Sequence, residues 1–265
     1  RCHPCRHGLS ARCGDGALFG WRPPEGHDGP ALDGAQAARV RVPLAATTLV
    51  PVPSSIPEEV ALLLGDNFTT GYSGARGAGA AAGRSIAVVG CGAVGLAAVS
   101  AARQLGSERV VAIDPVVSRR ARAATLGATA LSPEEAPAWV AEECRDSGGF
   151  DGVVEAVGRP SAQRLALSIL APGGTIAAVG VHADPTFAFA PGELYDRNAT
   201  YRAGRCPVRS LLDLLLPEVA AGRIVVPAET MVSDRGVPLA DGPQAYRRFA
   251  ARTDDTVKVV FTPGG

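Results

Sequence analysis

The stretch Arg84-Ser-Ile-Ala-Val-Val-Gly90-Cys-Gly92-Ala-Val-Gly95 decides the fold of this chain. Its apolar residues 86–89 predict a buried strand, and the small residues of 93–105 predict a helix. Between them the glycines have the spacing Gly-x-Gly-x-x-Gly, which is weak evidence alone because the chain holds 32 glycines. A glycine-rich structural turn is therefore the alternative. The strand before this glycine motif and the helix after it favour a dinucleotide-binding unit.

The residue that closes the next predicted strand supports the same interpretation. That strand covers 109–114, and its last residue, Asp114, lies 19 residues after Gly95. Gly90 would make the tight turn, Gly92 would let a pyrophosphate approach the backbone, and Gly95 would let helix and strand pack closely. Asp114 would accept hydrogen bonds from the adenosine ribose and repel a 2′-phosphate. The sequence therefore predicts NAD rather than NADP as the cofactor.

Strands and helices alternate over the middle of the chain. Strands that alternate with helices of 10 to 14 residues imply a parallel sheet covered on both faces. We therefore expect an α/β fold with a doubly wound parallel sheet over 68–205. The predicted strands cover 84–90, 109–114, 128–132, 151–156 and 174–180, and the predicted helices cover 93–105, 118–126, 133–144 and 161–170.

The two ends of the chain predict a second domain that is split around the first. Residues 1–53 are rich in glycine and proline, and an alternating segment at 38–43 predicts a half-buried strand. An amphipathic helix and a last apolar strand are predicted near the C-terminus. We expect 1–67 and 206–265 to form this second domain together.

Composition limits the partners of the chain. Its 26 basic and 26 acidic residues give a formal net charge of zero, so no basic field attracts a nucleic acid or a membrane surface. Apolar residues make up 46% and charged residues 20% of the chain, which is typical of a folded globular protein. The most apolar stretch, 86–102, is shorter than the ~18–20 residues of a membrane span, so we interpret it as strand, turn and helix.

Three of the six cysteines, Cys2, Cys5 and Cys13, lie within the first 13 residues. Clustered cysteines indicate metal ligands in a reducing compartment rather than a disulfide scaffold, so we expect a cytoplasmic protein. Three thiolates are one short of the four that a closed structural zinc site requires. His3, His7 or a cysteine upstream of the sequence could supply the fourth ligand, and free cysteines in a loop are the alternative.

The N-terminal segment Cys2-His-Pro-Cys5-Arg-His-Gly8-Leu-Ser-Ala-Arg-Cys13, taken with the glycine motif, resembles the zinc-dependent medium-chain alcohol dehydrogenases. In that family's structural-zinc lobe, which would cover 1–16 here, these three cysteines match the last three zinc ligands. The first ligand would precede Arg1, so the resemblance implies a chain that begins inside the zinc lobe. It also implies a Rossmann cofactor domain joined to the remainder of a GroES-like, β-rich catalytic domain.

A second stretch, Gly65-Asp66-Asn-Phe-Thr-Thr70-Gly71-Tyr72, resembles the family segment that supplies the third ligand of the catalytic zinc. Asp66 stands where many members have cysteine and where the formaldehyde dehydrogenase-like branch has aspartate. A carboxylate is an ordinary zinc ligand, and a helix-end cap is the alternative role for Asp66. The resemblance gives Thr70 a place beside the nicotinamide.

The same resemblance implies further cofactor contacts. Arg119 would face the adenosine ribose, while Val157 and Arg159 would line the adenosine side. Lys258, the only lysine of the chain, would reach the pyrophosphate, and a solvated lysine is the alternative. For His182 the sequence favours a surface position over one in the cofactor pocket. The residues predicted to contact NAD are Gly90, Gly92, Ala93, Val94, Gly95, Asp114, Arg119, Val157, Val179, Gly180, Val181 and Lys258.

The activity that the resemblance implies is hydride transfer between NAD and an alcohol, or a hydrated or adducted aldehyde, with a catalytic zinc polarising the substrate oxygen. The family's other two catalytic-zinc ligands would precede Arg1, so we expect the parent protein to be the dehydrogenase and this fragment by itself to be inactive. A non-catalytic NAD-binding protein is the alternative, and the cysteines disfavour a zinc-free quinone reductase-like member. Family subunits pair through their cofactor domains, which implies a homodimer or homotetramer.

Overall fold

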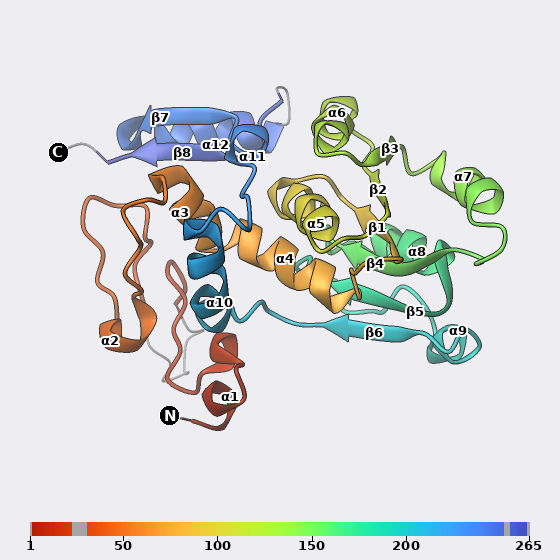
Figure 1. Ribbon diagram of the computed structural model, residues 1–265. Helices are drawn as coiled ribbons and strands as arrows, with labels where there is room; N and C mark the ends of the chain where they lie inside the picture. The colour runs from red at the N-terminus through yellow and green to blue at the C-terminus, as the bar shows by residue number, and fades with distance from the viewer. Residues whose placement is uncertain (1, 23–30, 252–254, 264–265) are drawn as a thin grey trace.

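A computed structural model describes residues 2–22, 31–251 and 255–263 of the chain. Its centre is a six-stranded parallel sheet with the strand order β3-β2-β1-β4-β5-β6 (Figure 1). The chain moves outward from β1 to β3 and then adds β4, β5 and β6 on the other side of β1. This confirms the predicted α/β fold with a doubly wound parallel sheet, and it puts the topological switch point between β1 and β4. The strands are β1 (Ser85–Val89), β2 (Arg109–Ile113), β3 (Thr129–Leu131), β4 (Phe150–Glu155), β5 (Leu170–Ala178) and β6 (Thr200–Ala203).

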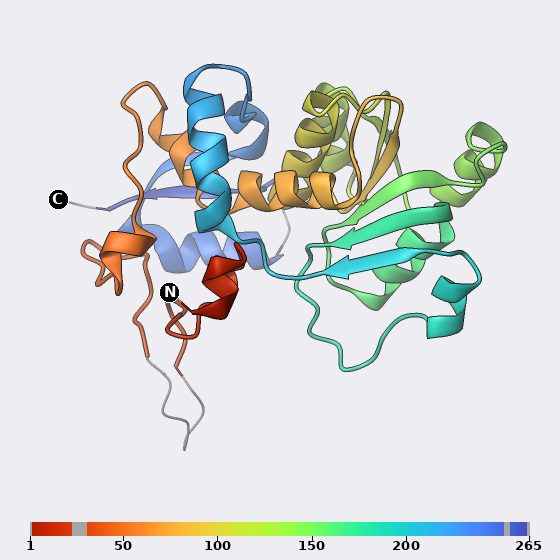
Figure 2. The same cartoon turned by 60° about the horizontal axis from the view of Figure 1, so that its bottom comes forward.

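Helices cover both faces of the sheet (Figures 1 and 2). Because successive side chains of a strand point to opposite faces, Ile86 and Val88 of β1 lie in one hydrophobic core and Ala87 and Val89 lie in the other. The first core is shared with α4, α5 and α6, and the second with α7 and α8. These helices are α4 (Asn67–Gly77), α5 (Ala93–Gln104), α6 (Val117–Thr125), α7 (Ala136–Glu143) and α8 (Pro160–Ser168).

The packing of α4 on α5 depends on Gly71. A Cβ at this position would lie 2.5 Å from the backbone nitrogen of Ala98 and 2.6 Å from the carbonyl oxygen of Val94. Only glycine permits so close an approach of two helices. The first turn of α4, which includes Thr70, is therefore held against the helix that follows the glycine motif.

The remaining elements form a body of helices and two short strands beside the sheet (Figure 2). Helix α10 contacts η1 and α2, since Ser210 donates to the hydroxyl of Ser10 at 3.2 Å and Arg209 donates to the carbonyl of Thr47 at 3.0 Å. Strands β7 and β8 pair in parallel. Helix α9 (Pro191–Tyr195) lies instead beside β6, and its Glu193 pairs with Arg164 of α8 (Figure 1). The elements of the body are α1 (His3–Arg6), η1 (Ser10–Arg12), α2 (Ala45–Thr48), α3 (Glu58–Leu64), α10 (Val208–Ala220), α11 (Ala228–Met231), β7 (Asp234–Pro238), η2 (Leu239–Asp241), α12 (Gly242–Ala251) and β8 (Val259–Thr262).

Two local expectations differ from the structure. Residues 38–43 form no strand and belong to neither sheet of the described chain, and Val40 is 40% exposed. The helix expected at 161–170 ends at Ser168, since the chain enters β5 at Leu170. The apolar stretch 86–102 divides into β1 and α5, as predicted. No helix within the described ranges has the length and apolar character to cross a membrane.

Candidate dinucleotide and zinc sites

A cavity of about 360 Å³ lies beside the glycine motif. It includes the start of α5, the first residue after β4, and residues of the C-terminal strands and helix, so it lies at the carboxyl ends of β1 and β4. In open α/β sheets, ligands bind at this switch point. The lining residues are Gln36, Asn67, Gly92, Ala93, Val94, Arg119, Ala156, Ala245, Tyr246, Phe249, Val257, Lys258, Val259 and Phe261. Five of the residues predicted to contact NAD are therefore brought together here: Gly92, Ala93, Val94, Arg119 and Lys258.

The geometry of the glycine motif fits a pyrophosphate. Gly90 has a φ of 95°, which makes the sharp turn out of β1. A Cβ at Gly95 would lie only 1.7 Å from the carbonyl oxygen of Gly90, so strand and helix meet in contact. At Gly92 a Cβ would have no described atom within 4 Å, so the backbone there faces open space. The first N–H groups of α5, which lack acceptors within the helix, adjoin that space.

Asp114 lies directly behind the motif and is 3% exposed. Its Oδ2 accepts the backbone N–H of Cys91 at 2.8 Å, and its Oδ1 accepts that of Val116 at 2.8 Å. The guanidinium of Arg119 lies 4.0 Å from Oδ2. Burial, and secondarily the negative charge of Asp114, raises the pKa of the Cys91 thiol to about 12. The carboxylate is thus fixed in orientation next to the turn, and Asp114 is not among the residues that line the cavity.

Lys258 lines the same cavity as the start of the motif's own helix and lies just before β8. It is half-buried, and its carbonyl accepts the N–H and the hydroxyl of Ser233, each at 3.0 Å. Lys258 and Arg119 place two cations around one cavity, which suits a pyrophosphate dianion.

The other predicted contacts do not line the cavity: Gly90, Gly95 and Asp114 belong to the motif and the end of β2, and four residues lie on the turns after β4 and β5. Val157 is next to the motif, since a Cβ on Gly90 would lie 2.6 Å from its Cγ2. A Cβ on Gly180 would lie 2.2 Å from the nitrogen of Gly158, so the two turns are in close contact. Val181 is 87% exposed, and the side chain of Val179 packs toward α4.

Asp66 and Thr70 are joined at the start of α4. Asp66 occupies the N-cap position, but within the described chain its side chain makes no capping bond to a backbone N–H. Instead Oδ1 accepts the hydroxyl of Thr70 at 3.0 Å and Oδ2 accepts the amide of Asn67 at 3.3 Å. The thiol of Cys206, whose pKa is raised by burial, donates to the carbonyl of Thr69 at 3.5 Å. The exposed carboxylate of Asp66 keeps lone pairs that can bind a metal.

The three N-terminal cysteines form a group suited to zinc. The Sγ atoms of Cys2, Cys5 and Cys13 lie within 4.8 Å of one another. Hydrogen bonds from the backbone N–H groups of Gly14 and Cys5 lower the pKa of Cys2 to about 7, while the thiols of Cys2 and Cys13 raise that of Cys5 to about 11. Three thiols this close fit three corners of a tetrahedral zinc site.

The two histidines considered as a fourth ligand do not join this group. Among the residues that the structure describes, the group holds the three cysteines alone. The rings of His3 and His7 pack on each other instead, with centroids 4.3 Å apart. The prediction that one of them completes the site is therefore unsupported by the geometry.

Sequence reasoning missed the C-terminal side of the cavity. Tyr246 stacks on Phe261 with ring centroids 6.3 Å apart, and its hydroxyl donates to Gln36 Oε1 at 2.7 Å. Phe249 also lines this side of the cavity. These residues belong to no motif, and only the fold brings them to the glycine turn, so no sequence signal marked them.

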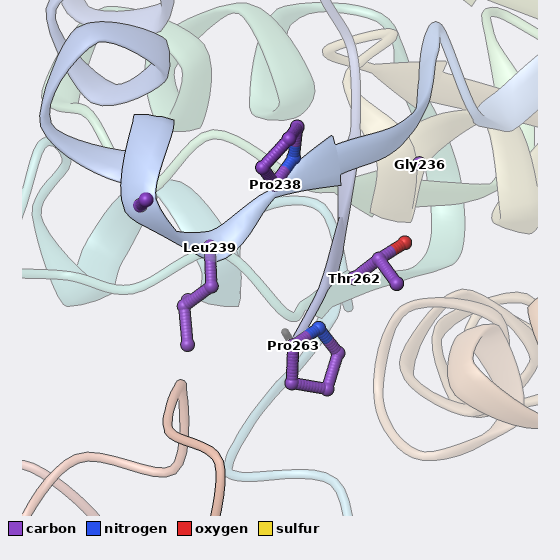
Figure 3. A pocket seen from close by; sticks show the side chains of 6 residues that line it. Gly236, Pro238, Leu239, Thr262 and Pro263 are labelled. Atoms are coloured by element: carbon purple, nitrogen blue, oxygen red, sulfur yellow. The ribbon is translucent and has the colours of Figure 1, made fainter. Parts of the chain in front are cut away.

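Another hollow, of about 350 Å³, lies between β7, η2 and the end of β8 (Figure 3). Its side chains are apolar apart from the hydroxyl of Thr262, and no charged residue lines it. It offers little to orient a polar ligand. The lining residues are Gly236, Pro238, Leu239, Ala240, Thr262 and Pro263.

Comparison with known proteins agrees with this geometry. A family model described as zinc-binding dehydrogenase matches residues 93–209. Zinc-type alcohol dehydrogenase B of Aspergillus flavus is 32% identical over 272 residues, which cover 99% of this chain and 60% of that protein. A probable zinc-binding alcohol dehydrogenase of Mycobacterium tuberculosis is 35% identical over 232 residues, or 88% of this chain and 59% of that protein.

A solved structure gives the same result for the fold. Alcohol dehydrogenase TADH from Thermus sp. ATN1 matches with a TM-score of 0.88 and 34% identity, covering 99% of this chain and 74% of that chain. The chain spans about 60% of the length of the curated relatives named above. Sequence and fold lead to one conclusion: the chain belongs to the zinc-type medium-chain alcohol dehydrogenase family.

Proposed function

We propose that this chain is the NAD-binding part of a zinc-dependent dehydrogenase that transfers a hydride between NAD and an alcohol, or a hydrated or adducted aldehyde. The observation that carries the proposal is the cavity in which the glycine turn faces Arg119 and Lys258. Asp114 stands behind the turn, buried and fixed in orientation by two backbone N–H groups. This combination suits a dinucleotide with an unphosphorylated ribose.

Each group of the dinucleotide is assigned its own residues. The N–H groups at the start of α5, from Gly92 to Val94, bind the pyrophosphate, and Lys258 neutralises it. Asp114 accepts the ribose hydroxyls, with Arg119 beside it. The turn after β4 at Val157 lines the adenosine side. The turn after β5, at Val179, Gly180 and Val181, presents its backbone to the nicotinamide.

Zinc is proposed at two places. Cys2, Cys5 and Cys13 hold a structural ion, which the proximity of their thiols supports. Asp66 is one ligand of a catalytic ion, and its carboxylate supports assignment to the formaldehyde dehydrogenase-like branch. A bound catalytic zinc supplies Lewis-acid polarisation of the substrate oxygen. Thr70 holds the Asp66 carboxylate by the hydrogen bond from its hydroxyl, at 3.0 Å.

The wider setting is proposed from the family resemblance alone. The cofactor domain covers 68–205, and the segments 1–67 and 206–265 belong to the catalytic domain. The assembly is a homodimer or homotetramer of cytoplasmic location, and its partner is the small-molecule substrate.

Calorimetric titration of the chain with NAD and with NADP tests the proposal. We expect NAD to bind and NADP to bind at least about tenfold more weakly, because Asp114 repels the 2′-phosphate. Titration of Lys258→Gln tests whether NAD binds in this cavity. Arg247→Gln, which removes an exposed cation, is the control. An absence of NAD binding, or equal affinity for both dinucleotides, would contradict the proposal.

A further inference from the structure

Glu155, the last residue of β4, is a buried carboxylate at the carboxyl edge of the sheet. It is 0% exposed, and its Oε1 accepts the backbone N–H groups of Val157 and Gly158 at 2.8 Å each. Burial, with a further contribution from the charge of Glu155, raises the pKa of Tyr201 on β6 to about 12. One oxygen of Glu155 thus holds the turn after β4, and the other is left for a different partner.

That partner is His182, which follows β5. Glu155 Oε2 and His182 Nε2 lie 3.2 Å apart, and neither atom has a hydrogen bond of ordinary geometry in the described chain. The His182 side chain is half-buried, 23% exposed, and it does not line the cavity beside the glycine motif. An unpaired buried polar atom is unfavourable, and here each atom has the other as its nearest available partner.

Gln163 on α8 sets which ring nitrogen carries the proton. Its Oε1 accepts the backbone N–H of Ala188 at 3.2 Å, so its amide nitrogen faces His182 Nδ1. The amide nitrogen can only donate, and therefore Nδ1 accepts. The hydrogen of a neutral His182 then lies on Nε2, the ring nitrogen 3.2 Å from Glu155 Oε2, a tautomer assigned from this network.

We propose that His182 is a positioning residue that anchors the turn after β5 to the buried Glu155 and so shapes the nicotinamide half of the dinucleotide site. The backbone already ties this turn to Glu155, whose carbonyl accepts the N–H groups of Val179 at 2.8 Å and Gly180 at 3.0 Å. Val181, which is 87% exposed, therefore lies between two residues that are both linked to Glu155, Gly180 and His182.

The link acts on one half of the site. Without His182, Glu155 Oε1 still holds the turn after β4, which lines the adenosine side. The turn after β5 loses its side-chain link to Glu155 and keeps only the backbone bonds of Val179 and Gly180 to the Glu155 carbonyl. The inference rests on the proposed function, because it takes the turn after β5 to face the nicotinamide.

The test compares NAD with ADP-ribose, which has the same adenosine, phosphates and ribose but no nicotinamide. We expect His182→Leu to raise the Kd of NAD about tenfold and that of ADP-ribose less than about twofold. His182→Gln keeps a donor in the place of Nε2 and restores NAD binding to within about threefold of wild type. Ile176→Val, a core change in β5, controls for general loosening and leaves both constants unchanged.

Three results would overturn the inference while leaving the proposed function intact: an unchanged Kd of NAD in His182→Leu, an equal rise for both ligands, or no rescue by glutamine. Wild-type protein that binds neither ligand would overturn the proposed function and the inference together. If His182→Leu does not fold, nitrogen-15 NMR of the wild-type protein decides. A proton on Nε2 of His182 supports the anchor, and a proton on Nδ1 alone contradicts it.

Discussion

The carboxylate of Asp114 accepts a hydrogen bond from the backbone N–H of Cys91 at 2.8 Å, and this bond joins the end of β2 to the middle of the glycine motif. Because Cys91 lies between Gly90 and Gly92, the acceptor proposed for the ribose and the turn proposed for the pyrophosphate are held in one rigid unit. In the proposed function, dinucleotide choice and phosphate binding are therefore coupled through a single buried side chain.

Asp114→Ala tests that coupling. We expect the Kd of NAD to rise about tenfold or more, because a charge-assisted acceptor is lost, and the preference for NAD over NADP to shrink, because the repulsive charge is removed. Calorimetric titration with both dinucleotides measures the two effects, and thermal unfolding of the variant checks that the fold persists. An unchanged ratio of the two affinities would count against the role of Asp114.

Two glycines of the motif should respond in opposite ways to the same added methyl group. Gly95→Ala places a Cβ 1.7 Å from the Gly90 carbonyl oxygen, so we expect a loss of at least ~3 kcal/mol and a Tm lowered by roughly 6–12 °C. Gly92→Ala meets no described atom within 4 Å, so its stability should stay within about 0.5 kcal/mol of wild type.

Binding separates the same two variants. The methyl group of Gly92→Ala enters the space proposed for the pyrophosphate, so we expect the Kd of NAD to rise about tenfold. Unfolding curves and titrations of the pair measure both properties. If Gly92→Ala binds NAD with the same Kd as wild type, the pyrophosphate does not lie at this turn.

The cysteine group should bind zinc through thiolates. Cobalt substituted for zinc should give a sulfur-to-metal charge-transfer band that Cys5→Ala abolishes and Cys144→Ala, a buried cysteine on another element, retains. Metal binding releases thiol protons, so affinity should rise as pH increases from about 6 to 8. Cys2, with a pKa lowered to about 7, passes to its thiolate form in this range. A band that survives in Cys5→Ala would contradict the site.

Asp151 should make stability depend on acid pH. Burial raises its pKa, but hydrogen bonds at 2.8 Å from the backbone N–H and hydroxyl of Ser85, with Arg84 at 3.8 Å, outweigh burial and lower it below 3.8. A pKa lower in the folded state than in the unfolded state stabilises the fold above the unfolded value. That stabilisation is lost as pH falls through the folded value.

The comparison of wild type with Asp151→Asn measures this contribution. At pH 7 we expect the variant to be less stable by about 1 kcal/mol, after allowance for solvent screening, or ~2–4 °C in Tm. The gap should shrink below about pH 4, where wild type also loses the charge. Asp213→Asn, which breaks an exposed pair with Arg209, serves as control. A gap that stays constant from pH 7 to 3 would refute the assignment.

The sequence predicted those parts of the molecule that depend on local pattern. The strand, glycine turn and helix of 84–105 could be predicted directly, because an apolar run and glycine spacing are properties of neighbouring residues. The segment 38–43 also has a strand pattern, that of alternation, but it forms no strand, since a strand also needs a partner that local pattern does not supply.

Contacts between segments that are far apart in the sequence could not be predicted from local pattern. No residue near His182 in the sequence predicts a contact with Glu155, and the two meet because β4 and β5 are neighbours in the sheet. A glutamate at the end of an apolar strand was the available signal for a buried polar link. Tyr246 carried no such signal, because its place at the cavity depends on how the C-terminal segment folds back.

The central claim is that NAD binds between the glycine turn and Lys258. It is tested most directly by measuring whether NAD protects Lys258 from acetylation. Lys258 is the only lysine of the chain, so mass spectrometry can follow its acetylation by acetic anhydride without ambiguity among lysines. If the pyrophosphate of NAD lies between the glycine turn and Lys258, saturating NAD should slow this acetylation about tenfold, and adenosine, which has no phosphate, should not. An unchanged rate under conditions where calorimetry shows NAD bound would contradict the account, because the dinucleotide would then lie elsewhere.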